Sequence, residues 1–211
     1  MHRLRVLAVG DPPPFVQEVR DGARREVAPP EGSIPPRSVT AGGEPLRIRL
    51  GRPSSEVMLP VPGDGRVELR SSHGDKWLDF PLAPGEASLA LVWRGGRDWN
   101  QPRALVVPDD PSSRMAGNVH FLNLTASPLA VVVGPAKIRL DPGKSFTRRV
   151  TAEGGAISLE ILYPTVAGGL RSCHSSSLEA TGGNYSRFVI FPADGKKPRL
   201  PVKVLHLQEP G

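Results

Sequence analysis

An internal repeat constrains this chain more than any other feature. Three pairs of segments align in order: residues 3–10 (RLRVLAVG) with 118–125 (NVHFLNLT), 44–51 with 127–134, and 89–93 (LALVW) with 187–191 (RFVIF). A repeat of about 100 residues is too long for a solenoid, whose units run about 20 to 50 residues. It suits a small β domain that has been duplicated.

Composition and pattern both favour strands. The 23 glycines and 24 prolines cut the chain into short elements, because proline interrupts helices and central strands. Leu46, Ile48 and Leu50 alternate with Arg47 and Arg49, as in a half-buried strand. We therefore predict an all-β fold of two tandem antiparallel, immunoglobulin-like β-sandwich units, residues 1–110 and 111–211, joined by the linker 109–113.

The alignment also locates differences in length. The first pair of segments is offset by 115 residues and the second by 83, which predicts an insertion in the first unit at about residues 12–43. The last pair is offset by 98, which lengthens the second unit, and we expect the extra residues near 166–177. Both differences should lie in loops, where function concentrates.

The insertion contains one regular segment, residues 15–27, flanked by prolines. It fits either a short helix or two strands around an Asp21-Gly22 turn, and we favour the hairpin. Its apolar side chains favour burial, and we therefore expect the insertion to pack across the second unit or the junction between the units. These side chains are Phe15, Val16, Val19, Val27 and Ile34.

Charge is distributed unevenly over a chain whose formal net charge is +6. Residues 1–110 hold 15 Lys+Arg and 15 Asp+Glu, whereas residues 111–211 hold 12 and 6. The basic second unit is a candidate for binding an anionic polymer, although a solvated face in an arginine-rich protein explains scattered charge equally. Nucleic acid is not an expected partner. The candidate side chains are Arg148, Arg149, Lys196, Lys197 and Arg199.

No catalytic motif is found in the sequence. It has no P-loop, dinucleotide fingerprint, nucleophile elbow or His-Glu-x-x-His pattern. Cys173 and His174 are adjacent, but neighbouring residues of an extended segment point to opposite faces and cannot easily form a nucleophile–base pair. A single cysteine also excludes an internal disulfide. We predict no enzyme activity, no cofactor and no metal site.

Two tryptophans are candidate ligand contacts. Trp99 lies in a polar loop beside Arg97 and Asn100, and Trp77 falls on the polar side of its strand. Exposed aromatic rings flanked by hydrogen-bonding groups can stack on a sugar. The alternative is that these tryptophans cover the inter-unit interface or the insertion.

Part of the second unit resembles a known class of protein. Residues 119–125 (VHFLNLT), 128–134 (PLAVVVG) and 140–144 (LDPGK) combine a strand ending in Asn-Leu-Thr, a proline turn, a strand ending in glycine and a Pro-Gly turn. This pattern is similar to uncharacterised bacterial exported, immunoglobulin-like tandem-repeat modules. The resemblance covers about 30 residues, is fainter in the first unit, and implies an extracytoplasmic setting without catalytic residues. Asn123 and Asn184 also match the glycosylation sequon, to which we assign no function.

These observations favour a non-enzymatic binding or scaffolding module of the cell envelope, with an envelope protein or polysaccharide as partner. Two alternatives stay open: a carbohydrate-binding module using Trp99 and Trp77, and an anionic-polymer binder using the basic second unit. The sequence has no run of 18 apolar residues. The extracytoplasmic location (periplasm or cell surface) assumes that a signal segment has been removed; without one we expect a cytoplasmic protein.

Overall fold

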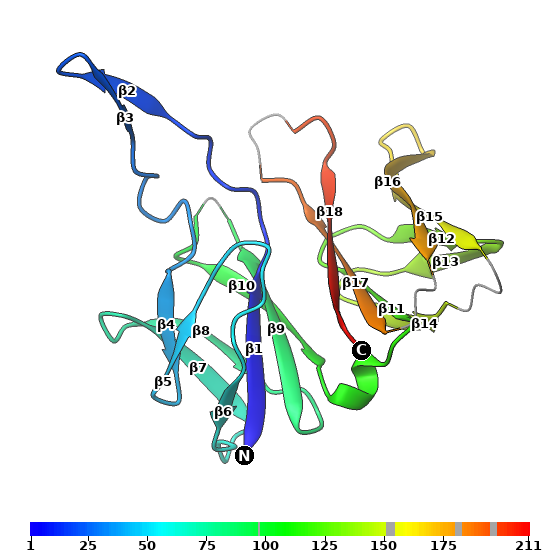
Figure 1. Cartoon of the computed structure of the whole chain (residues 1–211), viewed down its shortest axis with the longest axis horizontal. Helices are drawn as coiled ribbons and strands as arrows, with labels where there is room; N and C mark the ends of the chain where they lie inside the picture. The colour runs from blue at the N-terminus through cyan, green and yellow to red at the C-terminus, as the bar shows by residue number, and fades with distance from the viewer. Residues whose placement is uncertain (97, 151–154, 180–182, 195–197) are drawn as a thin grey trace. The chain divides into compact units, whose positions relative to one another are not determined.

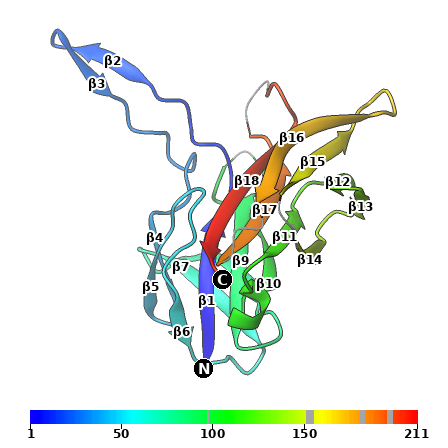
Figure 2. The same ribbon diagram turned by 45° about the vertical axis from the view of Figure 1, so that its right-hand side comes forward.

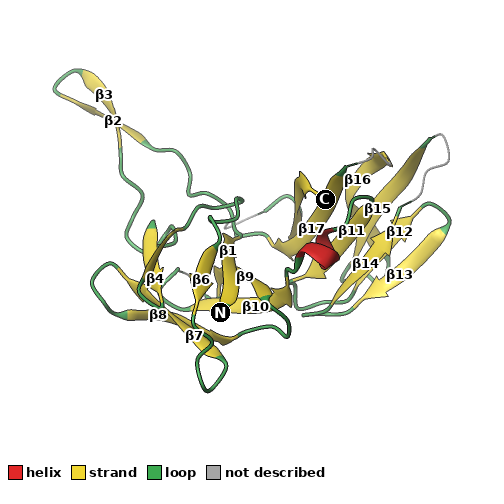
Figure 3. Cartoon of the chain, turned by 60° about the horizontal axis from the view of Figure 1, so that its bottom comes forward, coloured by secondary structure: helices red, strands yellow, loops and turns green. Residues whose placement is uncertain are grey.

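Strands form nearly all of the regular structure in the computed structural model, which describes every residue except 97, 151–154, 180–182 and 195–197. The described residues contain the strands β1 to β18 and one short 3-10 helix, η1 (Pro111–Arg114) (Figures 1 and 3). The prediction of an all-β fold is confirmed. The chain divides into two units, Met1–Asp110 and Pro111–Gly211, at the linker expected from the sequence.

The first unit is a sandwich of two four-stranded sheets, in the orders β10-β9-β1-β6 and β5-β4-β7-β8 (Figure 2). Its strands are β1 (His2–Ala8), β4 (Ser38–Ala41), β5 (Glu44–Arg47), β6 (Val57–Leu59), β7 (Arg66–Ser71), β8 (Lys76–Pro81), β9 (Ala87–Arg94) and β10 (Pro102–Pro108). Inward-facing residues of both sheets share one core, which includes Leu4, Leu46 and Leu69.

The second unit has the same design, with sheets in the orders β14-β11-β17-β18 and β13-β12-β15-β16. Its strands are β11 (Asn118–Asn123), β12 (Leu129–Val133), β13 (Ala136–Leu140), β14 (Ser145–Arg149), β15 (Ala156–Pro164), β16 (Leu170–Glu179), β17 (Asn184–Pro192) and β18 (Val202–Pro210). Phe121, Ile161 and Phe188 lie at the centre of its separate core.

Strand register supports the duplication. Leu4 of β1 lies opposite Ser88 of β9, and Val119 of β11 lies opposite Ser186 of β17. Leu4 and Val119 are 115 residues apart in the sequence, and Ser88 and Ser186 are 98 residues apart. These are the offsets that align the first and the last pair of repeated segments. Both pairs of strands run parallel, whereas the sequence predicted only antiparallel neighbours. Direction could not be predicted because alternation of apolar residues is the same in either direction.

The predicted insertion of residues 12–43 extends too far. β4, within that range, pairs with β5 and β7 as β12 pairs with β13 and β15, and its Val39 and Ala41 are buried core residues. Gly42 and Gly134, which follow β4 and β12, both have φ 56°. The sequence matched β5 to β12 because adjacent strands of one hairpin carry similar apolar patterns. The insertion therefore ends before Ser38.

Residues 15–27 form a hairpin, as predicted. β2 (Gln17–Arg20) pairs only with β3 (Ala23–Glu26) among the described strands, around Asp21 at φ 54° and Gly22 at φ 76°. All eight strand residues are exposed. The expected burial of the insertion's apolar side is wrong for its hairpin: Phe15, Val16, Val19 and Val27 are exposed, and Ile34 is half-buried.

The extra length of the second unit lies in strands rather than in a loop. β15 and β16 are nine and ten residues long, whereas β7 and β8 have six each. Most of the segment expected to be a loop, residues 166–177, belongs to β16.

Candidate functional site

The outer edge of the first unit carries the candidate site. β5 is an edge strand, at one end of its sheet. Leu46 and Ile48 point into the core, so Arg47 and Arg49 point outward, because successive strand residues face opposite sides. The ladder between β4 and β5 continues one step further, since the Ile48 N–H donates to the Arg37 carbonyl at 3.0 Å.

A pocket of about 550 Å³ opens beside this edge. One wall, Ile34-Pro35, comes from the insertion, and the rest comes from Arg37-Ser38 and from residues 47–50. Its volume falls within the range of about 300–1,000 Å³ that small-molecule sites occupy. Its lining combines apolar residues with three arginines.

These three arginines are available to a ligand. Arg37, Arg47 and Arg49 are all exposed. Within the described residues, none of their guanidinium groups makes an ion pair. Arginine presents N–H donors in a planar fork that matches carboxylate and phosphate oxygens. Arg47 and Arg49, side by side on the outward face of β5 and the residues that follow it, raise the local electrostatic potential and favour an anion there.

The second unit acts as an internal reference for this site. Turn and register place Arg37, Arg47 and Arg49 at the positions of Leu129, Arg139 and Asp141. There the Arg139 Nε donates to the Asp141 carboxylate at 2.7 Å, so the cation is neutralised. The connection from β11 to β12 spans only residues 124–128, whereas that from β1 to β4 spans residues 9–37. The sandwich therefore folds without arginine at the positions of Arg37 and Arg49, and the set of three cations is particular to the first unit.

The expectation that Trp99 is exposed is wrong. Trp99 is 1% exposed and belongs to the first core. Its backbone N–H donates to the Gly32 carbonyl at 2.8 Å. The half-buried Trp77 donates its indole N–H to the Trp99 carbonyl at 2.8 Å. The loop after β9 folds back because Gly95 bonds to Gln101, which carries Trp99 inward. Trp99 thus cannot stack on a sugar without unfolding.

Of the other two predicted loop contacts, Asn100 and Arg97, the structure describes only Asn100. Asn100 is exposed and its N–H is bonded to Asp98 at 3.0 Å. Arg97 lies outside the described residues.

The predicted basic residues of the second unit do not form one patch in the described structure. Arg148 and Arg149 are consecutive on the edge strand β14, so their side chains point to opposite faces. Arg199 is exposed in the segment before β18. Lys196 and Lys197 lie outside the described residues.

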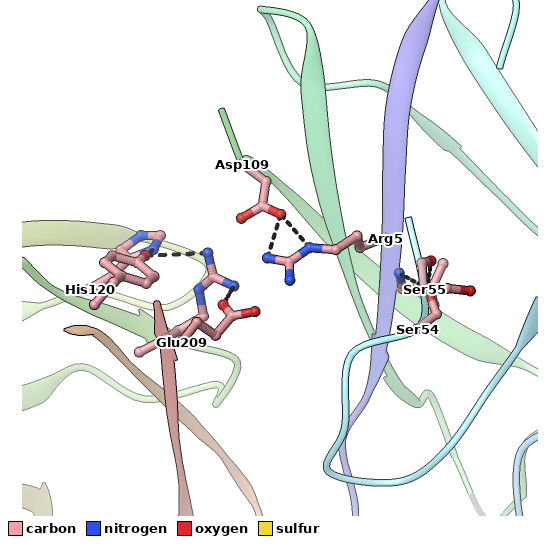
Figure 4. Close-up of polar contacts among 9 residues, drawn as sticks. Arg5, Ser54, Ser55, Asp109, His120 and Glu209 are labelled. Carbon is pink, nitrogen blue, oxygen red and sulfur yellow. Dashed lines mark hydrogen bonds and ion pairs between the residues drawn. The ribbon is translucent and has the colours of Figure 1, made fainter. Parts of the chain in front are cut away.

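Two buried ion pairs occupy equivalent places in the units. In the first, Arg5 Nη2 lies 2.6 Å from Asp109, whose side chain is 1% exposed (Figure 4). In the second, Arg187 Nη1 lies 3.4 Å from Glu209. The strand register places Asp109 and Glu209 at equivalent positions of the two units. The arginines are not equivalent, because Arg5 belongs to β1 whereas Arg187 belongs to β17, the neighbour of the strand that corresponds to β1. Asp109 belongs to the segment expected to be a linker, and its burial shows that its side chain also pairs with Arg5 inside the first unit.

Cys173 and His174 engage different partners. The Cys173 thiol donates to the Ile161 carbonyl at 3.3 Å, and burial raises the pKa of this thiol to about 11. His174 Nε2 contacts the Ser176 hydroxyl at 3.0 Å instead. The thiol therefore stays protonated at neutral pH and has no base beside it among these contacts. Within the described residues, no group of three or more His, Cys, Asp or Glu side chains could hold a metal ion.

No protein-family model matches the chain, and no curated protein matches it significantly. Among the described residues, no helix has the length and apolar character needed to cross a membrane. Sequence reasoning missed the pocket, although it recognised that Arg47 and Arg49 face outward. A correct alignment of the two units would have placed Arg49 opposite Asp141 and shown that a cation in the first unit replaces an anion in the second.

Proposed function

We propose that this protein is a binding module without catalytic activity, and that its first unit binds an anionic ligand in the arginine-lined pocket. One observation carries the proposal: Arg47 and Arg49, which share the outward face of β5 and the residues that follow it, line a pocket together with Arg37, and none of the three makes an ion pair in the described structure. Charge-assisted hydrogen bonds from guanidinium groups to an oxyanion are about twice as strong as neutral ones.

The contrast between the units supports a function for these side chains. An ordinary solvated face needs no pocket, and the equivalent edge of the second unit neutralises its own arginine with Asp141. The first unit has equal numbers of cationic and anionic side chains, so its pocket attracts anions through local arrangement rather than net charge.

The setting that we propose is extracytoplasmic, with an immunoglobulin-like module of the bacterial envelope as the class. Support comes from the resemblance of residues 119–144 to exported modules. Fractionation of cells that express the full gene tests this part, and recovery of the protein only from the cytoplasm would reject it.

The binding proposal is tested by copying the second unit's chemistry into the first. Arg49→Asp places a carboxylate beside Arg47, as Asp141 lies beside Arg139. Calorimetric titration with inorganic pyrophosphate at low salt should show binding by the natural protein that weakens as salt rises. Arg49→Asp should reduce the affinity by about tenfold or more, since a charge-assisted contact is replaced by repulsion.

The matched control is Arg149→Asp, which makes the same change of charge on an exposed strand of the second unit. It should leave the pyrophosphate affinity within about twofold, because Arg149 is not among the residues that line the pocket. Equal weakening by both variants would mean that net charge, not the pocket, attracts the anion. Absence of any binding at low salt would reject the proposal.

A further inference from the structure

The apolar wall of the pocket is a strap fixed at both ends. The strap is the segment 32–37. At its first end the Gly32 carbonyl accepts the Trp99 N–H at 2.8 Å, and at its last end the Arg37 carbonyl accepts the Ile48 N–H at 3.0 Å. Ile34 and Pro35, between these two anchors, line the pocket.

The first anchor is part of the core. Trp99 is buried and its carbonyl accepts the Trp77 indole N–H at 2.8 Å. Gly32 has φ 72°, and a Cβ at this position would lie 3.2 Å from both Asn100 Nδ2 and Asp98 Cβ. A left-handed glycine in close contact with the loop is what lets the strap approach Trp99. We call the contact between Gly32 and Trp99 the clasp.

The pocket has two chemical parts. Ile34 of the strap and Leu50 of the opposite wall, both half-buried, supply apolar surface, whereas the arginines supply charge. A simple inorganic anion would use only the guanidinium groups and leave the apolar surface hydrated.

An added peptide strand is a poor fit to this edge. β5 contains Pro45, which has no N–H to offer a neighbouring strand. Proline on an edge strand is a common device against strand addition. Recognition therefore depends on side chains.

We infer, resting on the proposed function, that the ligand is an amphiphilic oxyanion. Its phosphate or carboxylate is held by Arg47 and Arg49, and its apolar part lies against the strap. Gly32 and Trp99 act as positioning residues, because the clasp holds the strap where the apolar part of the ligand binds.

A series of alkyl phosphates, from methyl to hexyl phosphate, tests the class of ligand on the full chain by calorimetry. Each methylene that enters the apolar pocket should raise the affinity by about fourfold, as expected from its transfer out of water. Arg49→Asp should lower every affinity by a similar factor and leave the gain per methylene unchanged. Affinities that do not rise with chain length would overturn the inference while leaving anion binding intact.

The clasp is tested with two glycines of similar backbone conformation. Gly32→Ala should reduce the gain from about fourfold to less than twofold per methylene, with methyl phosphate affinity and its salt dependence retained. The control, Gly22→Ala, has the same left-handed strain at φ 76° but no atom within 4 Å of the added carbon. It should match the natural protein. Equal gains per methylene in all three proteins would overturn the positioning role.

Trp77→Phe provides a second variant if Gly32→Ala does not fold, because it removes the bond to the Trp99 carbonyl and keeps an aromatic ring. It should also lower the gain per methylene, and an unchanged gain would again reject the clasp. Failure of pyrophosphate and every alkyl phosphate to bind the natural protein would instead reject the proposed function itself.

Vesicles distinguish two sources of such a ligand. Binding to phosphatidylcholine vesicles that contain phosphatidic acid, but not to phosphatidylcholine alone, would assign the ligand to a lipid surface. Binding to soluble alkyl phosphates without vesicle binding would assign it to a free metabolite. Either result supports the amphiphilic oxyanion, whereas equal binding to both vesicles would contradict recognition of the phosphate.

Discussion

Asn123 shows how one side chain can define a turn. It is completely buried at the end of β11. Its amide donates to the carbonyls of Ser127 at 2.9 Å and Leu140 at 3.0 Å, and its oxygen accepts from the Thr125 N–H and hydroxyl. The Asn-Leu-Thr motif is therefore explained by hydrogen bonding. A buried Asn123 is also inaccessible to glycosylation in the folded unit.

Asn123→Ala should lower the free energy of unfolding of the second unit by about 2–3 kcal/mol, because it leaves several buried polar groups without partners. Urea unfolding monitored in the second unit measures the change. Asn184→Ala is the control, since Asn184 is exposed and its side chain makes no hydrogen bond within the described residues. A similar loss in both variants would show that the hydrogen bonds of Asn123 are not the cause.

At the scale of elements, the hairpin β2–β3 is unusual because all of its strand residues are exposed. Its turn could be predicted because Asp21-Gly22 suits the left-handed backbone of a two-residue loop. Its exposure could not be predicted, since Phe15, Val16 and Val19 have the composition of a buried face. Apolar residues show that burial would be favourable, but only the fold shows whether a surface covers them.

Removal of the hairpin should leave the first sandwich folded. Val27 N–H donates to the Val16 carbonyl at 2.9 Å, so the two limbs are adjacent there and Gly-Gly can replace residues 17–26. The free energy of unfolding should change by less than about 1 kcal/mol, since the deleted side chains are exposed. Circular dichroism during urea titration measures this.

Deletion of residues 38–43 is the comparison for that experiment. It removes β4 with the buried Val39 and Ala41, and should abolish cooperative unfolding of the first unit. If the hairpin deletion were equally damaging, the hairpin would contribute to the core and the placement of the insertion would be wrong.

At the scale of the whole molecule, burial holds several histidines neutral. Desolvation lowers the pKa of His2, His120, His174 and His206, and for His120, beside Arg187, the pKa falls to about 3. The unfolded chain takes up these protons near pH 6.5, before the folded chain does. The stability contributed by neutral histidine is therefore complete above pH 6.5 and is lost as the pH falls toward 3.

His120 should contribute the largest part of this loss. Between pH 7 and pH 5 its share is roughly 2 kcal/mol, from the difference between its folded and unfolded pKa values. His120→Gln keeps a polar group that can reach the Tyr185 hydroxyl but does not titrate. Urea unfolding across this pH range should show a shallower decline in the variant, and identical profiles would contradict the assignment to His120.

The all-β class, the repeat and the Asp21-Gly22 hairpin could be predicted from the sequence by itself. Alternation, turn residues and self-similarity act over short stretches, and their physical causes are local sterics and hydrogen bonds. The register of β4, the parallel direction of β1 and β9, and the burial of Trp99 were decided by tertiary structure. Each depends on which distant segments meet. The arginine pocket belongs to the same group, because packing brings Ile34 and Pro35 of the insertion against the edge that carries Arg47 and Arg49.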